Sequence, residues 1–343
     1  MRYVNIDSVE PGQYLGRTIF SHNGTVLLNE GVQLTVSMIS TLRRVGVTML
    51  YIKDEADEAA DMPELLSDET KLVVMKRMSE TMNAIRSGKE FNTRAISVSV
   101  DQILEDVLRN KEVLVQLTDI RTRENEMFVH ATNVAMMSAL IGMNMQLNQI
   151  QLKELTIGAL LHDIGKVEMI ADDRSDDPKL HHTWRGFDLL KQKRELNLLI
   201  AHVAFQHHEQ PDGQGVPRGL PDDQIHLYAK IVAVANTYDN LVYDPKTGAR
   251  RLPHEACEMV SAMAGTKLDR EAVIQFLRII SVYPNGTSVR LSTKETGVVV
   301  GQHRGLPGRP IVRVIRTDRQ DDWEAKEIDL AKHPTVFIEQ VLG

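Results

Sequence analysis

The sequence predicts a mainly α-helical protein with a small α+β module at the N-terminus and a small β subdomain at the C-terminus. Between about residues 70 and 284, apolar side chains recur at helical spacing. Before and after this region, short apolar segments alternate with turns rich in Gly and Pro. Nine of the twelve histidines lie between residues 124 and 284, which concentrates candidate metal ligands in the helical part.

Composition limits the classes of protein and partner. A chain of 343 residues with 42% hydrophobic and 25% charged residues is typical of a globular protein. The single cysteine, Cys257, excludes an internal disulfide framework and favours the cytoplasm. No apolar run approaches the roughly 18 residues of a membrane span. A net charge of −7 argues against DNA as a partner but permits a local basic pocket for a phosphate ligand.

Residues 1–53 are expected to form the N-terminal α+β module, an accessory or regulatory unit without a catalytic arrangement. Its hairpin turn is predicted at Asn23-Gly24. The flanking strands and the helix follow from alternating and helical apolar spacing, and the expected elements are strands Tyr14–Ile19, Thr25–Leu28 and Val47–Ile52 and helix Thr35–Val45.

Two segments connect this module to the histidine-rich region. Residues 54–69 are acidic and contain Pro63, which indicates a linker. Residues 70–123 are expected to form a helical connector with helices over Thr70–Arg86 and Val100–Leu117. These helices can pack on the later core or form the interface of a homodimer.

The most informative stretch is LLHDIGK, residues 160–166. The apolar run Ile157–Leu161 places His162 and Asp163 side by side, about 100° apart on a helix. Such a pair can hold one metal from two directions, or two neighbouring metals, and its imidazole and carboxylate suit a divalent transition metal. Lys166, three residues after Asp163, can hold an anionic substrate. The alternative is a capped helix end with a chance His-Asp pair.

Further polar groups lie around this stretch in the sequence. Glu126 and His130 are one helical turn apart. They can form a pair of metal ligands, or they can be a solvated Glu and a His of the core. His181-His182 taken alone are solvated loop residues. His207-His208-Glu209 lead into the Gly- and Pro-rich residues 211–220, which can form a lip that contacts substrate or a plain connector. Asn236 and Asp239 lie three apart on a predicted helix, Ile231–Leu241.

Three motifs in this order and spacing resemble the HD-GYP domain, a branch of the HD superfamily of metal-dependent phosphohydrolases. They are LLHDIGK, HHE-x-x-DG-x-G-x-P-x-GL at residues 207–220 and VAN-x-YDNL at residues 234–241. The resemblance covers about residues 100–284. It implies an HD-type helical bundle, expected here as a catalytic domain over residues 124–284. It also implies two or three divalent metals, usually iron or manganese, and phosphodiesterase activity on cyclic di-GMP.

The resemblance also implies a role for each matching residue. Asp163 is expected to bridge the metals and Lys166 to contact the substrate phosphate, so that both are expected catalytic residues. The implied metal ligands are Glu126 (the extra carboxylate of the three-metal form), His130, His162, Asp163, His182, His207, His208 and Asn236. The implied substrate-binding residues are Lys166, Asp212, Gly215, Val216, Asp239, Arg250 and Arg251. Alternatively, the two arginines belong to a surface turn without contact to substrate.

Three positions depart from the family pattern. Val216 replaces the Tyr of Gly-Tyr-Pro, which affects nucleotide affinity or base preference more than chemistry. Asn236 replaces the last ligating Asp, and a neutral amide oxygen holds a cation less well, although Asp239 one turn on can compensate. Thr183 stands where Pro is usual after His182.

Residues 285–343 are expected to form the C-terminal β subdomain, which can support dimerisation or cover the site. Its expected strands, separated by Gly- and Pro-rich turns, are Ser288–Leu291, Thr296–Val300 and Ile311–Ile315.

The sequence thus predicts an enzyme that hydrolyses cyclic di-GMP to pGpG, GMP or both by a metal-bound hydroxide. One alternative is a degenerate member that binds cyclic di-GMP or a partner protein without hydrolysis, which the Val216 and Asn236 departures favour. Another is a phosphohydrolase for a different nucleotide, since fold does not determine substrate.

Overall fold

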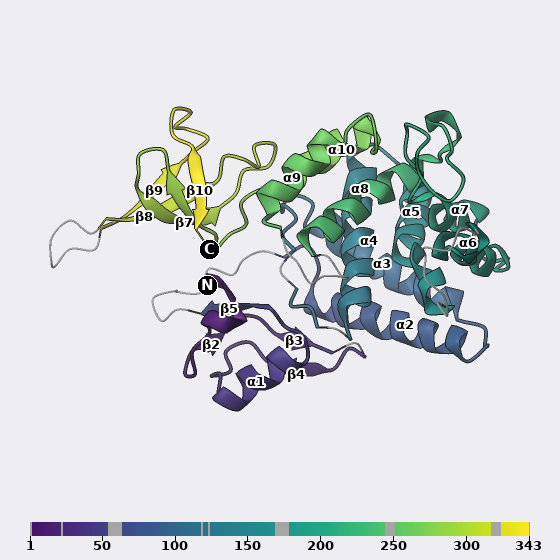
Figure 1. Ribbon diagram of the computed structural model, residues 1–343, viewed down its shortest axis with the longest axis horizontal. Helices are drawn as coiled ribbons and strands as arrows, with labels where there is room; N and C mark the ends of the chain where they lie inside the picture. Colours follow the sequence, from purple (N-terminus) through teal and green to yellow (C-terminus); the bar gives the residue numbers. More distant parts are fainter. Residues whose placement is uncertain are drawn as a thin grey trace.

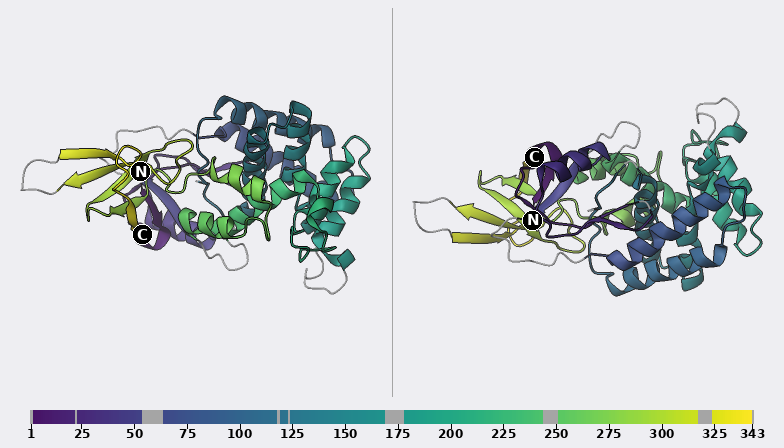
Figure 2. Two further views of the ribbon diagram at one scale, coloured as in Figure 1. Left: turned by 90° about the horizontal axis from the view of Figure 1, so that it is seen from above. Right: turned by 90° about the horizontal axis from the view of Figure 1, so that it is seen from below.

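The computed structural model describes residues 2–21, 23–53, 64–117, 119–122, 124–168, 178–243, 251–316 and 324–342. A helical bundle forms the largest part, with a small strand-and-helix unit on one side and a separate sheet at the C-terminus (Figure 1, Figure 2). The predicted fold class, mainly α with small β-containing units at both ends, is confirmed. None of the helices in the described residues has the length and apolar character needed to cross a membrane.

The N-terminal unit contains two small antiparallel sheets and one helix. Strands β1 (Arg2–Asn5), β5 (Met49–Lys53) and β2 (Tyr14–Leu15) form one sheet in that order, and β3 (Ile19–Phe20) pairs with β4 (Val26–Leu28). Helix α1 (Val36–Arg44) begins where the Thr35 side chain accepts a hydrogen bond from the Met38 amide. The predicted strand Tyr14–Ile19 is therefore two strands, because the chain leaves β5 after Gly16 and changes partner.

The helical bundle is built around two helices that are apolar on almost every side. Residues 128–142 of α4 are all buried, and α5 shares most of its surface with the bundle, as expected for central helices. The bundle helices are α2 (Asp68–Arg86), α3 (Thr93–Arg109), α4 (Glu126–Asn144), α5 (Gln149–Leu161), α6 (His182–Lys191), α7 (Leu198–Gln206), α8 (Leu227–Val242), α9 (Pro253–Ala262) and α10 (Arg270–Leu277).

The predicted helix over Val100–Leu117 is wrong at both ends. Helix α3 begins earlier, because the Asn92 side chain caps the Ala95 amide, and it ends at Arg109 before Asn110. The buried Val115 beyond it is extended and exchanges backbone hydrogen bonds with Ile279 and Ser281. Its apolar character therefore reflects pairing with a distant segment and not a longer helix.

Two glycines allow the helices around the histidines to approach closely. A Cβ at Gly158 on α5 would lie 2.7 Å from Val203 Cγ2 on α7. A Cβ at Gly165, in the 3₁₀ helix η2 (Ile164–Glu168), would lie 2.0 Å from the backbone oxygen of His182. Only a residue without a side chain fits at either contact, which brings the end of α5 against α6 and α7.

The C-terminal unit is a five-stranded antiparallel sheet with its own small core. Its order is β10 (Ile338–Leu342), β6 (Ser288–Leu291), β7 (Thr296–Gly301), β8 (Ile311–Arg316) and β9 (Glu324–Asp329). The three predicted strands are present. Strand β9 was not predicted because four of its six residues are charged. The Asn285 amide, bonded to Gln116 Oε1 at 3.1 Å, joins the sheet to the bundle.

Candidate metal centre

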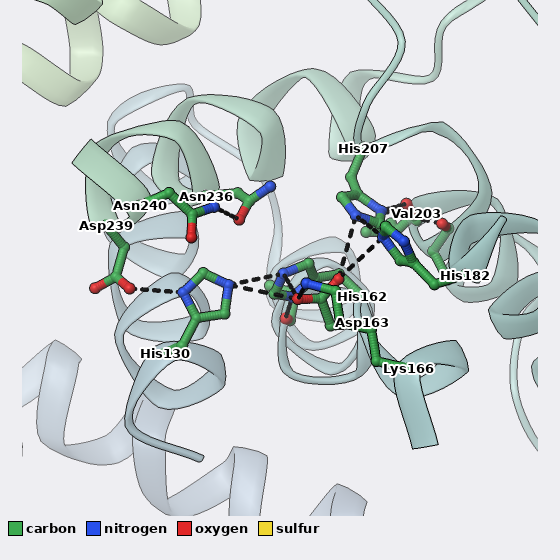
Figure 3. A network of polar contacts seen from close by, with 12 residues as sticks. His130, His162, Asp163, Lys166, His182, Val203, His207, Asn236, Asp239 and Asn240 are labelled. Atoms are coloured by element: carbon green, nitrogen blue, oxygen red, sulfur yellow. Dashed lines mark hydrogen bonds and ion pairs between the residues drawn. The ribbon is translucent and has the colours of Figure 1, made fainter. Parts of the chain in front are cut away.

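The carboxylate of Asp163 lies between two groups of imidazoles at the end of α5 (Figure 3). On one side, its Oδ2 is 3.6 Å from His130 Nε2 and 3.4 Å from His162 Nε2. On the other side, its Oδ1 is 3.2 Å from His182 Nε2 and 3.5 Å from His207 Nε2. One carboxylate therefore faces four imidazoles that come from four different segments of the bundle.

On the first side, hydrogen bonds at Nδ1 determine which ring nitrogen faces the centre. His130 Nδ1 is 2.6 Å from Asp239 Oδ2, and His162 Nδ1 is 2.7 Å from the Ala159 carbonyl oxygen. Both partners accept hydrogen bonds, so both Nδ1 atoms carry the proton and both Nε2 atoms present lone pairs. The two Nε2 atoms are 3.2 Å apart, and facing lone pairs at this distance favour a shared cation.

The second side has the same organisation. His207 Nδ1 is 3.0 Å from the Ala204 carbonyl oxygen, which leaves its Nε2 facing His182 Nε2 at 3.4 Å. His208 completes this group, and the ligand atoms of Asp163, His182, His207 and His208 all lie within 4.8 Å of one another. His130, His162 and Asp163 form the other group by the same measure, so that Asp163 belongs to both.

The protonation states match those that metal ligands require. Burial lowers the pKa of His162 and of His208 and brings the pKa of His207 to about 3, so these imidazoles are neutral at pH 7. Burial opposes ionisation of Asp163, but Lys166 and His162 outweigh it and hold the pKa of the carboxyl well below its usual range. Neutral imidazoles and an ionised carboxylate bind a metal without first losing a proton.

An unsatisfied oxygen also indicates that a cation belongs here. Asp163 Oδ1 is buried and has no hydrogen-bond partner among the described residues. A buried carboxylate oxygen without a partner is unfavourable, by roughly 1–3 kcal/mol or more for a charged group. Nitrogen and oxygen ligands of this kind suit divalent transition metals. The residues present therefore fit a bound divalent metal, and Asp163 belongs to both groups of candidate ligands.

Comparison with known proteins agrees with this centre. The model of the "HD domain" family matches residues 102–272, and the model of the "KOW domain associated with HD domain" matches residues 288–343. The chain belongs to the HD domain family. The HD domain covers α4 to α8 and so contains every histidine of the centre, and the predicted resemblance to HD-GYP proteins is confirmed.

Curated relatives of this HD-domain protein are phosphodiesterases of cyclic dinucleotides. The cyclic di-GMP phosphodiesterase PA4108 of Pseudomonas aeruginosa is 29% identical over 243 residues, which are 68% of this chain and 58% of the relative. A cyclic di-GMP phosphodiesterase of Thermotoga maritima is 29% identical over 49% of this chain and 48% of its own length. The 3'3'-cGAMP-specific phosphodiesterase 3 of Vibrio cholerae is 28% identical over 46% and 36%. The chain thus spans about half the length of these relatives.

The fold resembles that of a solved structure. Bd1817, an HDG"Y"P protein from Bdellovibrio bacteriovorus, aligns over 80% of this chain and 97% of its own with a TM-score of 0.51 and 15% identity. At this identity the likeness concerns the fold alone.

Two predicted ligands of the HD domain lie outside the two groups of converging atoms. Glu126 begins α4, one turn before His130, and is half-buried; burial raises its pKa although Arg121 and His130 oppose the shift. Asn236 is buried on α8, on the side of the centre that holds His130, and its Oδ1 accepts a hydrogen bond from Asn240 Nδ2 at 2.8 Å (Figure 3).

Asp239 has a different place from the predicted substrate contact. It is fully buried behind His130, and both of its oxygens accept hydrogen bonds. Oδ2 accepts from His130, and Oδ1 accepts from Arg121 at 2.5 Å and from Asn133 at 3.1 Å. A carboxylate on the far nitrogen of a metal-binding imidazole orients the ring and raises its basicity. The carboxylate of Asp239 is therefore buried behind His130, on the side away from Asp163 (Figure 3).

The loop after His208 is held against the centre by backbone contacts. The Val216 amide donates to the His208 carbonyl at 3.0 Å, and a Cβ at Gly215 would lie 2.2 Å from the Gln210 nitrogen. The buried Glu209 accepts hydrogen bonds from the amides of Arg218 and Leu220, both at 2.9 Å. Its structural role was not predicted, although its position in the HHE motif was the available signal.

The remaining predicted substrate residues occupy varied positions. Val216 is 47% exposed beside His208, and Asp212 accepts a hydrogen bond from the Gln214 amide within the loop. Lys166 Nζ lies 2.5 Å from Asp163 Oδ2, with about one third of its side chain exposed. Arg251 is exposed before α9, and Arg250 lies outside the described residues.

Proposed function

We propose that this HD-domain protein is a metal-dependent phosphodiesterase that hydrolyses cyclic di-GMP to pGpG, GMP or both. The observation that carries the proposal is the carboxylate of Asp163 shared by two groups of imidazoles. The names of the curated relatives support a cyclic dinucleotide as the substrate.

The centre is proposed to hold two iron or manganese ions. His130, His162 and Asp163 would hold one ion, with the amide of Asn236 beside them. Asp163, His182, His207 and His208 would hold the other. When bound, such a pair activates water at neutral pH and neutralises charge that develops on the phosphate. Glu126 would join only in a form with a third ion, because it contributes to neither group in the described residues.

The chain's own residues supply position and charge. Asp163 stays ionised because Lys166 lies 2.5 Å from its Oδ2. The partly exposed ammonium of Lys166 is proposed to contact a phosphate oxygen, where a positive charge in a poorly solvated site stabilises the transition state. Lys166 would thus act both on the metal bridge and on the substrate.

The loop at residues 209–220 is proposed to contact the nucleotide. Its anchoring by Glu209 and by the His208 carbonyl keeps the exposed Val216 at the edge of the centre. Valine presents a small apolar surface to a base where tyrosine would provide a stacking ring. Asp212, Gly215, Arg250 and Arg251 remain proposed substrate contacts.

A second candidate function is binding of cyclic di-GMP without hydrolysis. The neutral Asn236 favours it, because an amide gives a cation less stabilisation than a carboxylate does. A different cyclic dinucleotide substrate is a third candidate, since a relative at 28% identity is named for 3'3'-cGAMP.

A hydrolysis assay tests the proposal. Protein prepared anaerobically would be loaded separately with Fe(II) and Mn(II), given cyclic di-GMP or 3'3'-cGAMP, and its products separated by chromatography. We expect pGpG or GMP from the wild type and none from the His162→Ala, Asp163→Ala double variant. His254→Ala, a partly buried histidine stacked on Tyr283 outside the centre, is the control and should keep full activity. If the metal-loaded protein binds cyclic di-GMP but forms no hydrolysis product, the second candidate function, binding without hydrolysis, is favoured.

A further inference from the structure

A buried chain of side chains leads from Arg121 to the metal-facing nitrogen of His130. Arg121 Nη2 is 2.5 Å from Asp239 Oδ1, and Asp239 Oδ2 is 2.6 Å from His130 Nδ1. Arg121 is 4% exposed and Asp239 is fully buried, so water screens neither contact. Figure 3 shows the last link, with Asp239 behind His130 on the side away from Asp163.

Arg121 is the full positive charge that accompanies the Asp239 carboxylate. The other donors to Asp239 are the amide of Asn133 and the imidazole of His130. A buried charge needs a paired counter-charge, and removing one partner leaves the other uncompensated. Without Arg121, the buried carboxylate of Asp239 would carry an uncompensated charge and lose one of the contacts that fix its orientation, so the orientation of His130 Nε2 would be less defined.

The N-terminal unit holds the segment that carries Arg121. The neighbouring Ile120 is buried in the apolar core of that unit, together with residues such as Ile39 and Leu50. Asn125 Nδ2 donates to the Phe20 carbonyl at 2.8 Å and to the Ile120 carbonyl at 3.3 Å, which ties the start of α4 to strand β3. The guanidinium also lies over the Tyr243 ring, 4.9 Å from its centroid.

In the other imidazole group, His207 is oriented in a different way. His207 is oriented by carbonyl oxygens of its own helix, those of Val203 and Ala204. A disturbance at Arg121 should therefore reach the His130 side of the centre and leave the His207 side unchanged.

We infer that Arg121 is a positioning residue for the ligand His130, and that the N-terminal unit holds Arg121 in place through Ile120. This inference rests on the proposed function, because it gives His130 a metal to bind. It also assigns the N-terminal unit an effect on one metal of the pair.

The test measures Mn²⁺ affinity by competition with a chelator and Mn–Mn coupling by electron paramagnetic resonance, on the full chain. Arg121→Gln should weaken one of two Mn²⁺ sites by about 10- to 100-fold, the usual effect of losing a group that orients a ligand, with the second site unchanged. Arg121→Lys, which keeps the charge, should weaken the same site less. In the Arg121→Gln variant, the electron paramagnetic resonance signal of coupled Mn–Mn pairs should disappear at limiting Mn²⁺, because the weakened site stays empty. Arg309→Gln, which removes a hydrogen bond to the Val336 carbonyl in the C-terminal sheet, should change neither readout.

A matched pair of core variants tests the role of the N-terminal unit. Ile120→Ala should weaken the same Mn²⁺ site, whereas Ile39→Ala, in the same core and equally buried, should not. Equal weakening by both would show that only the stability of the unit matters and would overturn this part. If Arg121→Gln fails to fold, Arg121→Lys decides, because it keeps the charge and loses the planar guanidinium.

The outcomes separate the inference from the proposed function. Arg121 variants that keep both Mn²⁺ affinities, or that lose both sites equally, overturn the inference. A wild type that binds two Mn²⁺ ions but hydrolyses no cyclic dinucleotide contradicts the proposed function alone. A wild type that retains no Mn²⁺ contradicts both.

Discussion

The backbone of Gly165 lies against the backbone carbonyl of His182, so close that a Cβ at position 165 would be 2.0 Å from that oxygen. This contact joins the end of the LLHDIGK stretch, residues 160–166, to the first turn of α6. It explains how Asp163 and His182, which are separated in the sequence by residues 164–181, bring their ligand atoms to 3.2 Å.

Gly165→Ala is therefore expected to separate α6 from Asp163. Overpacking of this kind destabilises by about 1–3 kcal/mol, and a misplacement of about 1 Å in a site can reduce a rate on the order of 100-fold. Thermal unfolding and the dinucleotide hydrolysis assay would measure the two effects. Gly308→Ala, with no atom within 4 Å of its Cβ position, should leave both unchanged. Full activity of Gly165→Ala would show that the contact does not position His182.

The metal-free protein should lose stability as the pH falls below about 6.5. The pKa of His207 drops from its ordinary 6.5 to about 3 in the folded protein, so the unfolded chain binds more protons across this range. His162 and His208 shift in the same direction. Each such histidine contributes up to about 1.4 kcal/mol per pH unit, present above 6.5 and lost progressively toward pH 3.

Urea unfolding of chelator-treated protein at pH 4.5, 5.5 and 7 would measure this slope. Depression of the Asp163 pKa acts mainly below the ordinary carboxyl value of 3.8, so the histidines dominate this window. His207→Gln should have a shallower slope than the wild type, whereas His254→Gln should not. A slope of zero between pH 4.5 and 6.5 contradicts the neutral, buried state of these imidazoles.

Asn236→Asp should raise metal retention or turnover. The change places a carboxylate beside the His130 side of the centre, and a single group near a metal commonly alters affinity by about 10-fold or more. Metal content after dialysis against a chelator would measure it. Asn83→Asp, exposed on α2, adds the same charge away from the site and is the control. A fall in both retention and turnover would identify Asn236 as an adapted ligand.

Val216→Tyr should lower KM for cyclic di-GMP with little change in kcat. Stacking of a base on an aromatic ring is worth roughly 1–3 kcal/mol, which corresponds to on the order of 10-fold in affinity. The side chain is 47% exposed, so the larger residue fits without disturbing the core. Steady-state kinetics with cyclic di-GMP and 3'3'-cGAMP would report affinity and base preference together. An unchanged KM for both nucleotides would place Val216 away from the bases.

Local patterns were sufficient for much of the fold. Helical spacing predicted α2 and α8, and capping residues such as Thr35 mark real helix ends. The motifs identified His162, Asp163 and His207, because these residues stand in short stretches of sequence that are recognisable by themselves. Where a segment's apolar residues face a distant partner, as at Val115, the same spacing was misleading.

The sequence by itself determined the fold class, the family motifs and the residue types able to hold a divalent metal. These properties depend on helix propensity, capping and donor chemistry, which act over a few residues. Only the tertiary structure decided which imidazoles lie on each side of Asp163, that Asp239 orients His130, and that Arg121 accompanies Asp239. Arg121 and Asp239 are 118 residues apart, and burial of both charges in one bundle makes their pairing obligatory.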